Sequence, residues 1–483
     1  MQKKMEPKKT KYQYLAGNIA LFSVSNFVSK ILVFLLVPLY TNVLSTYEYG
    51  IADLLQVTLL LLVPAITVNM GEAALRFGIE KVDKRGSILR IGLGFTFKAD
   101  LVILFACLLG MFFVKPEYKW YLFLFIFLFA ANSLFEFLIL FFQGSEMVPV
   151  VVIGSVSSTL VMIISNIVFL LVVRIGLNGY ILSQIIAYSV ASAIMLILGK
   201  MGMEQIHLDK DNELKKEMVS YGIPMIAYST GSWVNNAADR YIVAGLCGSA
   251  ANGVYGVAYK IPAILMVFQR IFAQAWQMSA TKSYTDEKSN EFFTTMYKVY
   301  NTFMVIGCAF LVLFVKFIAA FLFRKEFYDA WRFVPPLLVS VIFGALTGFL
   351  GSICLAHKDS KAMGRATGIG AIINVVLNLL TVPFFGPMGA AWATAVSYFT
   401  MCIMAYIFVK KYVVINNRMV LELVGYGILI VEAVCMIAEI KYAYLISTLL
   451  CVCLICMYYR DIKEIAQKLI GIVIGKLKRG KSA

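Results

Sequence analysis

About fourteen apolar stretches, each roughly 20 residues long, follow one another along this chain of 483 residues. An α-helix needs about 20 apolar residues to cross the hydrocarbon core of a bilayer, and backbone groups in lipid must find their hydrogen bonds within the protein. Only 14% of the residues are charged, whereas soluble domains carry about a quarter. The sequence therefore predicts an all-α polytopic membrane protein with about fourteen transmembrane helices.

The predicted helices have uncertain ends but regular spacing. They cover residues 15–41, 51–71, 88–114, 120–142, 147–173, 178–199, 219–245, 252–278, 292–320, 331–356, 364–383, 387–409, 420–438 and 441–459. No polar stretch between them exceeds roughly twenty residues, and a soluble domain needs at least about 50. This argues against an appended soluble catalytic domain.

The basic residues are distributed unevenly between the two sides of these spans. Most of the 43 Lys and Arg residues lie in the two tails and in the loops on the same side as the N-terminus. Cytoplasmic loops retain positive charge, so both termini are predicted to be cytoplasmic. The net charge of +16 thus reflects orientation in the membrane, and no nucleic-acid partner is expected.

Two pairs of similar segments suggest an internal duplication. Aligning TNVLSTYEYGIADLL with AGLCGSAANGVYGVAYKI, and RIGLNGYILSQIIAYSV with FFGPMGAAWATAVSYFT, gives offsets of 206 and 210 residues. The matched residues are Tyr49-Gly50 with Tyr255-Gly256, and Gly176 and Gly179 with Gly386 and Gly389. A shared helical architecture would explain one match, but two matches at near-equal offset favour duplication. Two pseudo-symmetric six-helix lobes around a central cleft are expected.

This duplication defines the predicted domain organisation. The segments are a cytoplasmic N-tail at 1–14, an N-terminal lobe at 15–199, a cytoplasmic linker at 200–218, a C-terminal lobe at 219–409, two additional helices at 420–459, and a basic amphipathic cytoplasmic tail at 460–483. The tail has apolar residues at helical spacing with lysines between them, which is typical of a helix lying on an anionic leaflet.

Ionisable and polar residues within the spans are the strongest functional signal. A charge at the bilayer centre costs at least about 2.5 to 3.5 kcal/mol on insertion scales, so such residues normally face a partner or a watery cavity. The candidate substrate-binding residues are Lys30, Asn26, Asp53, Lys98, Asn235, Asn236, Asp239, Arg240, Lys260 and Arg270. Most of the charged ones are cations, which predicts a cleft that attracts an anion.

Most of these residues also have a structural alternative. Arg240 lies near the predicted outer interface and can snorkel or hold a structural charge. Lys98 can pair with another helix, Arg270 can reach the inner headgroups, and Asp53 lies close to an interface. Lys30, near the middle of the first helix, is the hardest to explain without a functional role.

Three further residues are candidates for gating or coupling. Glu72 and Arg76 lie one turn apart at the inner end of the second predicted helix, where they are expected to form a local pair or a gate element. Glu136 follows Asn132 by one turn in the fourth helix. It either binds a coupling proton or makes a buried hydrogen bond within the first lobe.

Three long segments carry a resemblance to a known family. They are NIALFSVSNFVSKILVFLLVPLYTNVLSTYEYGIADLL, WVNNAADRYIVAGLCGSAANGVYGVAYKI and GIGAIINVVLNLLTVPFFGPMGAAWATAVSYF. The chain resembles the polysaccharide-biosynthesis flippases of the multidrug/oligosaccharidyl-lipid/polysaccharide exporter superfamily over essentially its whole length, with the last two helices lying beyond the twelve-helix core.

The resemblance implies both a substrate and a mechanism. A flippase of this kind moves undecaprenyl-pyrophosphate-linked oligosaccharide from the cytoplasmic to the outer leaflet of the bacterial inner membrane by alternating access. Helices one, two, seven and eight would line the cavity. The implied partners are the lipid-linked oligosaccharide, membrane lipids and glycan polymerase machinery, with the protein a monomer. No cofactor or metal is expected, and coupling to H⁺ or Na⁺ is left open.

Two other classes of protein are weighed against this interpretation. A cation-coupled multidrug exporter of the same superfamily would place unpaired acids in its cleft, whereas the predicted cleft is basic. A membrane enzyme such as a glycan polymerase would need a long outer loop with catalytic residues, and the predicted outer loops are short. The sequence therefore predicts a transporter and not an enzyme.

Overall fold

The structure is a computed structural model that describes residues 34–202, 210–283, 289–357, 359–415 and 418–463. All regular elements in these ranges are helices, which confirms the all-α prediction. The chain forms two compact units that divide between Trp233 and Val234. This division falls inside a helix, whereas the predicted C-terminal lobe begins at residue 219.

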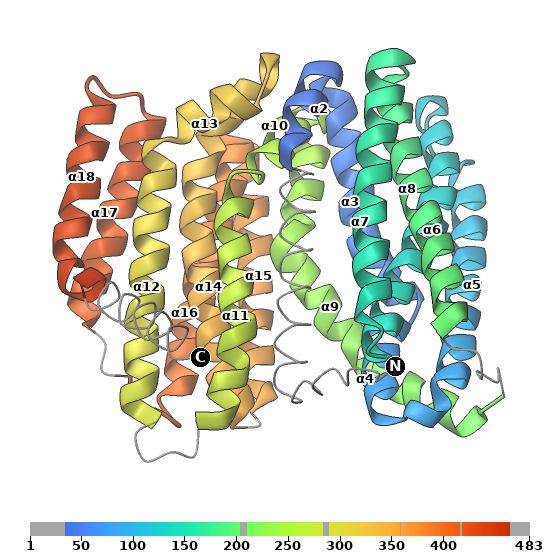
Figure 1. Ribbon diagram of the computed structural model, residues 1–483. Coiled ribbons are helices and arrows are strands. Elements are labelled where there is room, and N and C mark those ends of the chain that lie inside the picture. The colour runs from blue at the N-terminus through green and yellow to red at the C-terminus, as the bar shows by residue number, and fades with distance from the viewer. Residues whose placement is uncertain (1–33, 203–209, 284–288, 358, 416–417, 464–483) are drawn as a thin grey trace, which may run out of the picture. The chain divides into compact units, whose positions relative to one another are not determined.

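The first unit is a bundle of long helices that run side by side (Figure 1). Its elements are α2 (Val37–Val43), α3 (Thr46–Ile66), α4 (Met70–Glu80), η1 (Val82–Lys84), α5 (Arg85–Gly110), α6 (Pro116–Gly144), α7 (Val148–Asn166), η2 (Ile167–Val172), α8 (Gly176–Gly202) and the first part of α9 (Asn212–Cys247). The start of α3 is encoded locally, because Ser45 and Glu48 form a capping box there.

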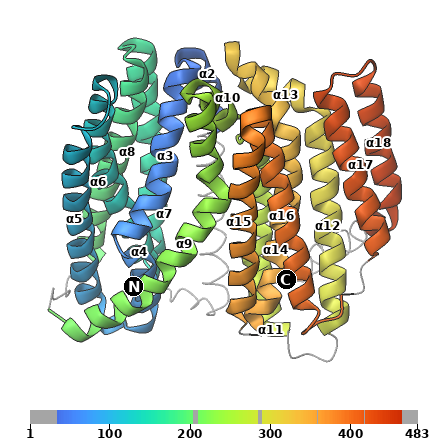
Figure 2. The same cartoon turned by 180° about the vertical axis from the view of Figure 1, so that it is seen from behind.

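The second unit contains the rest of α9 and all later helices. They are α10 (Ser249–Ala258), α11 (Pro262–Ser283), α12 (Ser289–Leu313), α13 (Val315–Leu322), η3 (Lys325–Phe333), α14 (Val334–Ala356), α15 (Ser360–Phe385), α16 (Pro387–Val409), α17 (Met419–Ile437) and α18 (Ala443–Met457). The last two pack on α12, as both views show (Figures 1 and 2). The two additional helices are thus a hairpin docked on the second unit.

The described residues contain ten helices that are long and apolar enough to span a membrane, or eleven if α10 and α11, bent by 50°, form one broken span. The 36-residue α9 is not among them, because polar residues interrupt its second half. The α18 helix is apolar but shorter, and most of the first predicted span lies outside the described residues. The count of fourteen therefore stays a prediction.

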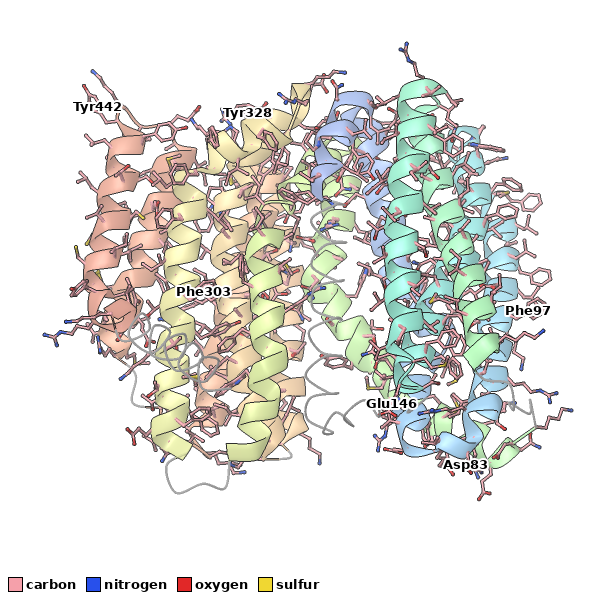
Figure 3. All side chains as sticks on the ribbon, in the orientation of Figure 1. Asp83, Phe97, Glu146, Phe303, Tyr328 and Tyr442 are labelled. Atoms are coloured by element: carbon pink, nitrogen blue, oxygen red, sulfur yellow. The ribbon has the colours of Figure 1, made fainter. Side chains whose placement is uncertain are left out.

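Large apolar side chains point outward from both units. Phe97 on α5 and Phe303 on α12 are 64% and 47% exposed (Figure 3). Exposed apolar residues of this size are unusual on a soluble protein but suit contact with lipid tails. The interior of the second unit is instead filled by stacked aromatic rings, including Trp276 and Phe349 with centroids 4.1 Å apart.

The glycines that the sequence repeat matches have equivalent roles in the two units. Gly176 at the start of α8 and Gly386 before α16 both have a positive φ, of 53° and 58°, which favours glycine. A Cβ on Gly179 would lie 3.2 Å from the Phe169 carbonyl oxygen, and one on Gly389 would lie 2.7 Å from the Thr381 carbonyl oxygen. Each pair therefore lets a helix start against the backbone of the preceding helix.

Candidate functional site

Polar residues gather on the second half of α9, where the sequence places four site candidates. Asp239 is 2% exposed, and its Oδ2 accepts hydrogen bonds from the hydroxyls of Tyr255 and Tyr259, each at 2.6 Å. The hydroxyl of Thr394 on α16 lies 3.4 Å from the same oxygen. Because hydrogen bonds to a charged acceptor are strong, this carboxyl group holds α9, α10 and α16 together.

Arg240 belongs to the same cluster. Its guanidinium carbon lies 4.4 Å from the centroid of the Tyr259 ring, a cation–π distance. The backbone N–H of Arg240 donates to Asp239 Oδ1 at 2.9 Å. An arginine side chain stacked on a tyrosine in this way keeps its planar donors in a fixed orientation, which suits binding of a phosphate group.

The two asparagines of α9 make contacts with different helices. Asn235 is buried and donates to the carbonyl oxygen of Thr367 at 3.2 Å. Asn236 is exposed and accepts from the hydroxyl of Tyr398 at 2.7 Å. Asn235 therefore fastens α9 to α15, whereas Asn236 and Tyr398 form an accessible polar pair.

The partners of this cluster are not among the predicted site residues. A hydrogen-bond chain continues from Thr394 to Asn374 at 3.3 Å and from Asn374 to Asn378 at 3.1 Å, so it joins α16 to α15. The two tyrosines could have been found, because Tyr255 and Tyr259 are one helical turn apart. Thr394 gave no signal in sequence, since threonine is common in transmembrane helices.

The remaining candidates of the second unit lie apart in the chain and differ in exposure. Lys260 is half-buried in the turn between α10 and α11, and Arg270 is exposed on α11. The first-helix candidates Lys30 and Asn26 lie outside the described residues. For these four residues, a role in substrate binding stays a prediction.

In the first unit, Asp53 lies beside a second polar network. Asp53 is 8% exposed on α3. One turn further along α3, the Gln56 side chain donates to Gln184 on α8 at 2.5 Å, and Gln184 also hydrogen-bonds Tyr180. This network crosses the interface between α3 and α8, so Asp53 is placed among groups that stabilise the bundle.

Lys98 lies on the exposed stripe of α5 that also carries Leu101 and Phe105. Its ammonium group is 5.5 Å from the Phe95 ring centroid. A lysine on an apolar outer face extends its ammonium group toward the headgroups. The role of Lys98 in substrate binding stays a prediction, as does its pairing with another helix.

Glu136 is exposed on α6, on the opposite side of the helix from Phe127 of the outer apolar face. Its neighbour Asn132, one turn before, is buried and hydrogen-bonds Tyr188 of α8. A carboxyl group exposed away from the lipid-facing stripe is accessible to a small cation. Its coupling role stays a prediction.

The expected pair of Glu72 with Arg76 is replaced by another. Arg76 Nε lies 3.1 Å from Glu80 Oε1, one turn further along α4, and its guanidinium stacks on Tyr221 at 4.8 Å. Glu72 lies in the first turn of α4, where a carboxylate is stabilised by the helix dipole. Both residues lie on α4, and Arg76 is directed to Glu80 and to Tyr221 of α9 instead. The proposed gating role of Glu72 and Arg76 is not tested by this geometry.

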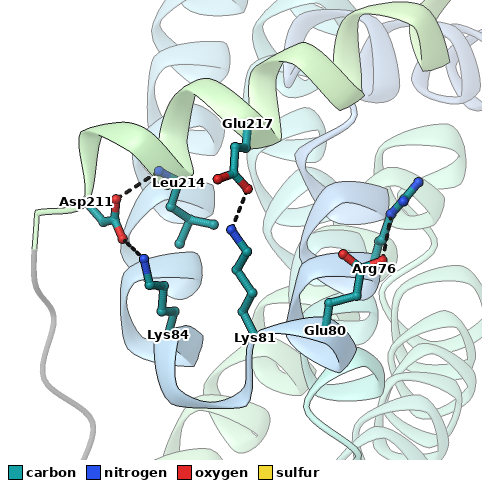
Figure 4. Close-up of polar contacts among 7 residues, drawn as sticks. All are labelled: Arg76, Glu80, Lys81, Lys84, Asp211, Leu214 and Glu217. Carbon is teal, nitrogen blue, oxygen red and sulfur yellow. Dashed lines mark hydrogen bonds and ion pairs between the residues drawn. The ribbon is translucent and has the colours of Figure 1, made fainter.

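Two ion pairs fasten the start of α9 to the α4–α5 connection (Figure 4). Lys81 pairs with Glu217, and Lys84 Nζ lies 2.7 Å from Asp211 Oδ2. The backbone N–H of Leu214 also donates to Asp211 at 2.8 Å. The hydrogen bond from Lys84 holds the pKa of the Asp211 carboxyl below its ordinary value.

This pKa shift predicts how the contact depends on pH. A carboxyl whose pKa is lowered by folding stabilises the folded state above its ordinary pKa and loses that effect as the pH falls through the lowered value. Hydrogen exchange of residues 211–217, corrected for intrinsic rates, should therefore be slow at pH 7 and faster near pH 3. The Asp211→Asn variant should exchange faster already at pH 7, and equal protection at both pH values in the unmodified protein would contradict the prediction.

Comparison with known sequences gives one family and two distant relatives. Residues 15–279 match the family described as polysaccharide biosynthesis protein. The chain is 23% identical over 265 residues to an uncharacterized membrane protein of Methanocaldococcus jannaschii, which covers 51% of this chain and 62% of that protein. It is 25% identical over 186 residues to the probable low-salt glycan biosynthesis flippase Agl15 of Haloferax volcanii, which covers 38% and 39%. The matches thus span less than two thirds of either relative.

Solved structures share the architecture. The lipid II flippase MurJ in an inward closed conformation superposes with a TM-score of 0.68 at 17% identity, covering 93% of this chain and all of that one. An inward-facing multidrug resistance MATE transporter of the MOP superfamily gives a TM-score of 0.66 at 13% identity, covering 79% and 94%. At these identities the likeness concerns the fold alone, and it confirms the expected architecture.

Proposed function

The chain belongs to the polysaccharide biosynthesis protein family, and we propose that it is a flippase that moves a lipid-linked oligosaccharide across the membrane. The family match covers more than half of the chain, and a relative named as a glycan biosynthesis flippase supports the same activity. The multi-pass helical fold, shared with a lipid II flippase, supports a transporter rather than an enzyme.

The proposed substrate is undecaprenyl-pyrophosphate-linked oligosaccharide, moved from the cytoplasmic to the outer leaflet of a bacterial inner membrane. Both termini would lie in the cytoplasm, and the protein would act as a monomer that hands its product to glycan polymerase machinery. The two units would open alternately to either side of the membrane. Membrane lipid would hold the polyprenyl tail throughout.

The observation that carries this proposal is the stacking of Arg240 on Tyr259 within the buried polar cluster of α9. A guanidinium in a low-dielectric site binds a pyrophosphate through charge-assisted hydrogen bonds. Lys30, Lys260 and Arg270 would add to a cationic cavity, and the accessible Asn236–Tyr398 pair offers hydrogen bonds to glycan hydroxyls.

The test compares two lysines that the sequence places within spans. Lys30→Ala should abolish glycan export, with lipid-linked sugar accumulating on the cytoplasmic side, while the protein remains in the membrane. Lys98→Ala is the matched control, because Lys98 lies on the outer apolar stripe of α5, and it should export normally. Normal export by Lys30→Ala would remove this residue from the mechanism.

A second candidate is a cation-coupled multidrug exporter, since a MATE transporter shares the fold. The accessible carboxyl of Glu136 is the group that would bind a coupling H⁺ or Na⁺ in either case. Deletion of the gene separates the candidates. Accumulated lipid-linked sugar without a change in drug susceptibility supports the flippase, and the reverse result supports the drug exporter.

A further inference from the structure

The second predicted helix is interrupted between Ile66 and Met70 by a helix-ending motif that lacks glycine. The N–H of Asn69 donates to the carbonyl oxygen of Pro64 at 2.8 Å, and the N–H of Val68 donates to that of Ala65 at 3.4 Å. This pair of bonds is the Schellman arrangement, in which the residue at the position of Val68 is left-handed and usually glycine.

Both residues of the break adopt a backbone conformation that costs free energy. Val68 has φ of 56° and Asn69 has φ of 50°. Asparagine tolerates the left-handed region, but a β-branched residue there is a genuine outlier. Such strain persists only when the surrounding structure imposes it, so the cause has to be sought outside residues 66–70.

The first half of α9 supplies these surroundings. A Cβ on Gly222 would lie only 2.1 Å from the carbonyl oxygen of Val68, so the backbone of α9 rests directly on the break. Asn69 Nδ2 donates to Ser229 Oγ at 3.2 Å. Further along, the indole N–H of Trp233 donates to the Val57 carbonyl oxygen at 2.6 Å. The break itself has no glycine at its left-handed position, whereas the residue of α9 that contacts it, Gly222, is a glycine.

Beyond the break, α4 and the start of α9 make both apolar and polar contacts. Leu214 and Met218 of α9 are fully buried in the same apolar cluster as Phe77 of α4. A cavity of about 540 Å³ lies there, lined by residues that include Arg76, Lys216 and Tyr221. The ion pairs Lys81–Glu217 and Lys84–Asp211 are partly exposed (Figure 4), and exposed pairs contribute little. The apolar contacts therefore hold the start of α9 on α4, whereas Gly222 and Ser229 are the residues of α9 that contact the break itself.

We propose that residues Gly222 and Ser229 of α9 form a latch that holds the α3–α4 break in its strained left-handed conformation. When α9 moves away, residues 67–69 relax and the angle between α3 and α4 changes. Because α9 continues from the first unit into the second, a movement of its second half reaches the break through the helix itself. The latch links a change in the second unit to a hinge within the first.

The test measures the distance across the break in the full-length protein. Spin labels are placed at Leu60 on α3 and Ile79 on α4, which are 65% and 55% exposed, with the exposed Cys247, Cys453 and Cys456 replaced by serine. The unmodified latch should give one main distance. Gly222→Ala should shift most of the population to a second distance, and Ser229→Ala should populate the same second distance in part.

Two further variants separate the latch from a general effect on α9. Gly231→Ala changes the same helix at a site where a Cβ meets no neighbour within 4 Å, and it should leave the distance unchanged. Val68→Gly removes the strain, so adding it to Ser229→Ala should restore the original distance. If Gly222→Ala does not fold, Ser229→Ala alone carries the test. An unchanged distance in the folded latch variants would show that the break is intrinsic to α3 and α4 and would overturn the proposal.

Discussion

Replacing Asp239 with alanine is expected to lower the free energy of unfolding by about 1 to 3 kcal/mol. The hydroxyls of Tyr255 and Tyr259 also lie 3.1 Å from each other, so one of the two is left without an acceptor, and such a loss costs about that much. Tyr255 and Tyr259 both donate to this carboxyl, and Thr394 lies within reach of it. Thermal unfolding of the purified protein measures the loss. Protein abundance in the membrane and glycan export should fall together.

A matched aspartate provides the control for this prediction. Asp329 on η3 belongs to the same unit but has a side chain that is 72% exposed, and its contact with Arg332 is 3.9 Å long. Asp329→Ala should therefore unfold at the same temperature as the parent protein. If Asp239→Ala were as stable as its control but inactive, the carboxyl would act on the substrate as the sequence analysis predicted, and its structural role would be secondary.

Replacing Gly144 with valine should strongly destabilise the first unit. A Cβ at this position would lie 2.5 Å from the carbonyl oxygen and 2.7 Å from the Cα of Leu75, and backbone atoms cannot move aside as a flexible side chain can. Gly78 of α4 faces the same point, so two glycines allow α4 and α6 to cross closely. Overpacking typically costs about 1 to 3 kcal/mol and occasionally more. Because backbone atoms are in the way here, we expect a large loss of the protein from the membrane.

Gly94→Ala tests whether this loss is specific. Gly94 lies within α5, and a Cβ there would meet no atom within 4 Å. Alanine is favoured over glycine in a helix by roughly 0.5 to 1 kcal/mol, so this variant should be as stable as the parent or slightly more stable. The test measures the membrane abundance and the unfolding temperature of Gly144→Val and Gly94→Ala in parallel. Equal abundance of both would contradict the close crossing of α4 and α6.

Much of the fold could be predicted because each transmembrane helix is a continuous apolar stretch of the sequence. Hydropathy located the helices of both units, and the repeated glycines at Gly176 and Gly386 marked two equivalent helix starts, where both glycines have a positive φ. The polar character of α9 was also evident, since Asn235, Asn236, Asp239 and Arg240 stand close together in the chain.

The partners of these residues could not be predicted. Asp239 was predicted to bind substrate, yet its carboxyl accepts hydrogen bonds from Tyr255 and Tyr259. The hydroxyl of Thr394, 155 residues later in the chain, lies within reach of the same oxygen. Arg76 was paired with Glu72, whereas it contacts Glu80 and Tyr221. A charge pattern shows which residues need a hydrogen-bonding or charged partner. It does not show which of several suitable residues is the partner, as Glu72 and Glu80 on either side of Arg76 illustrate.

The sequence by itself determined the fold class, the approximate positions of the helices, the family and the polar nature of α9. It could do so because the lipid environment imposes a simple rule of length and apolarity on each span. Only the tertiary structure decided where α3 ends, which contacts Asp239 makes and which glycines allow close helix crossings. These features depend on contacts between helices that are far apart in the chain, such as the contact of Gly222 with Val68. The local sequence at residues 66–70 does not predict this contact.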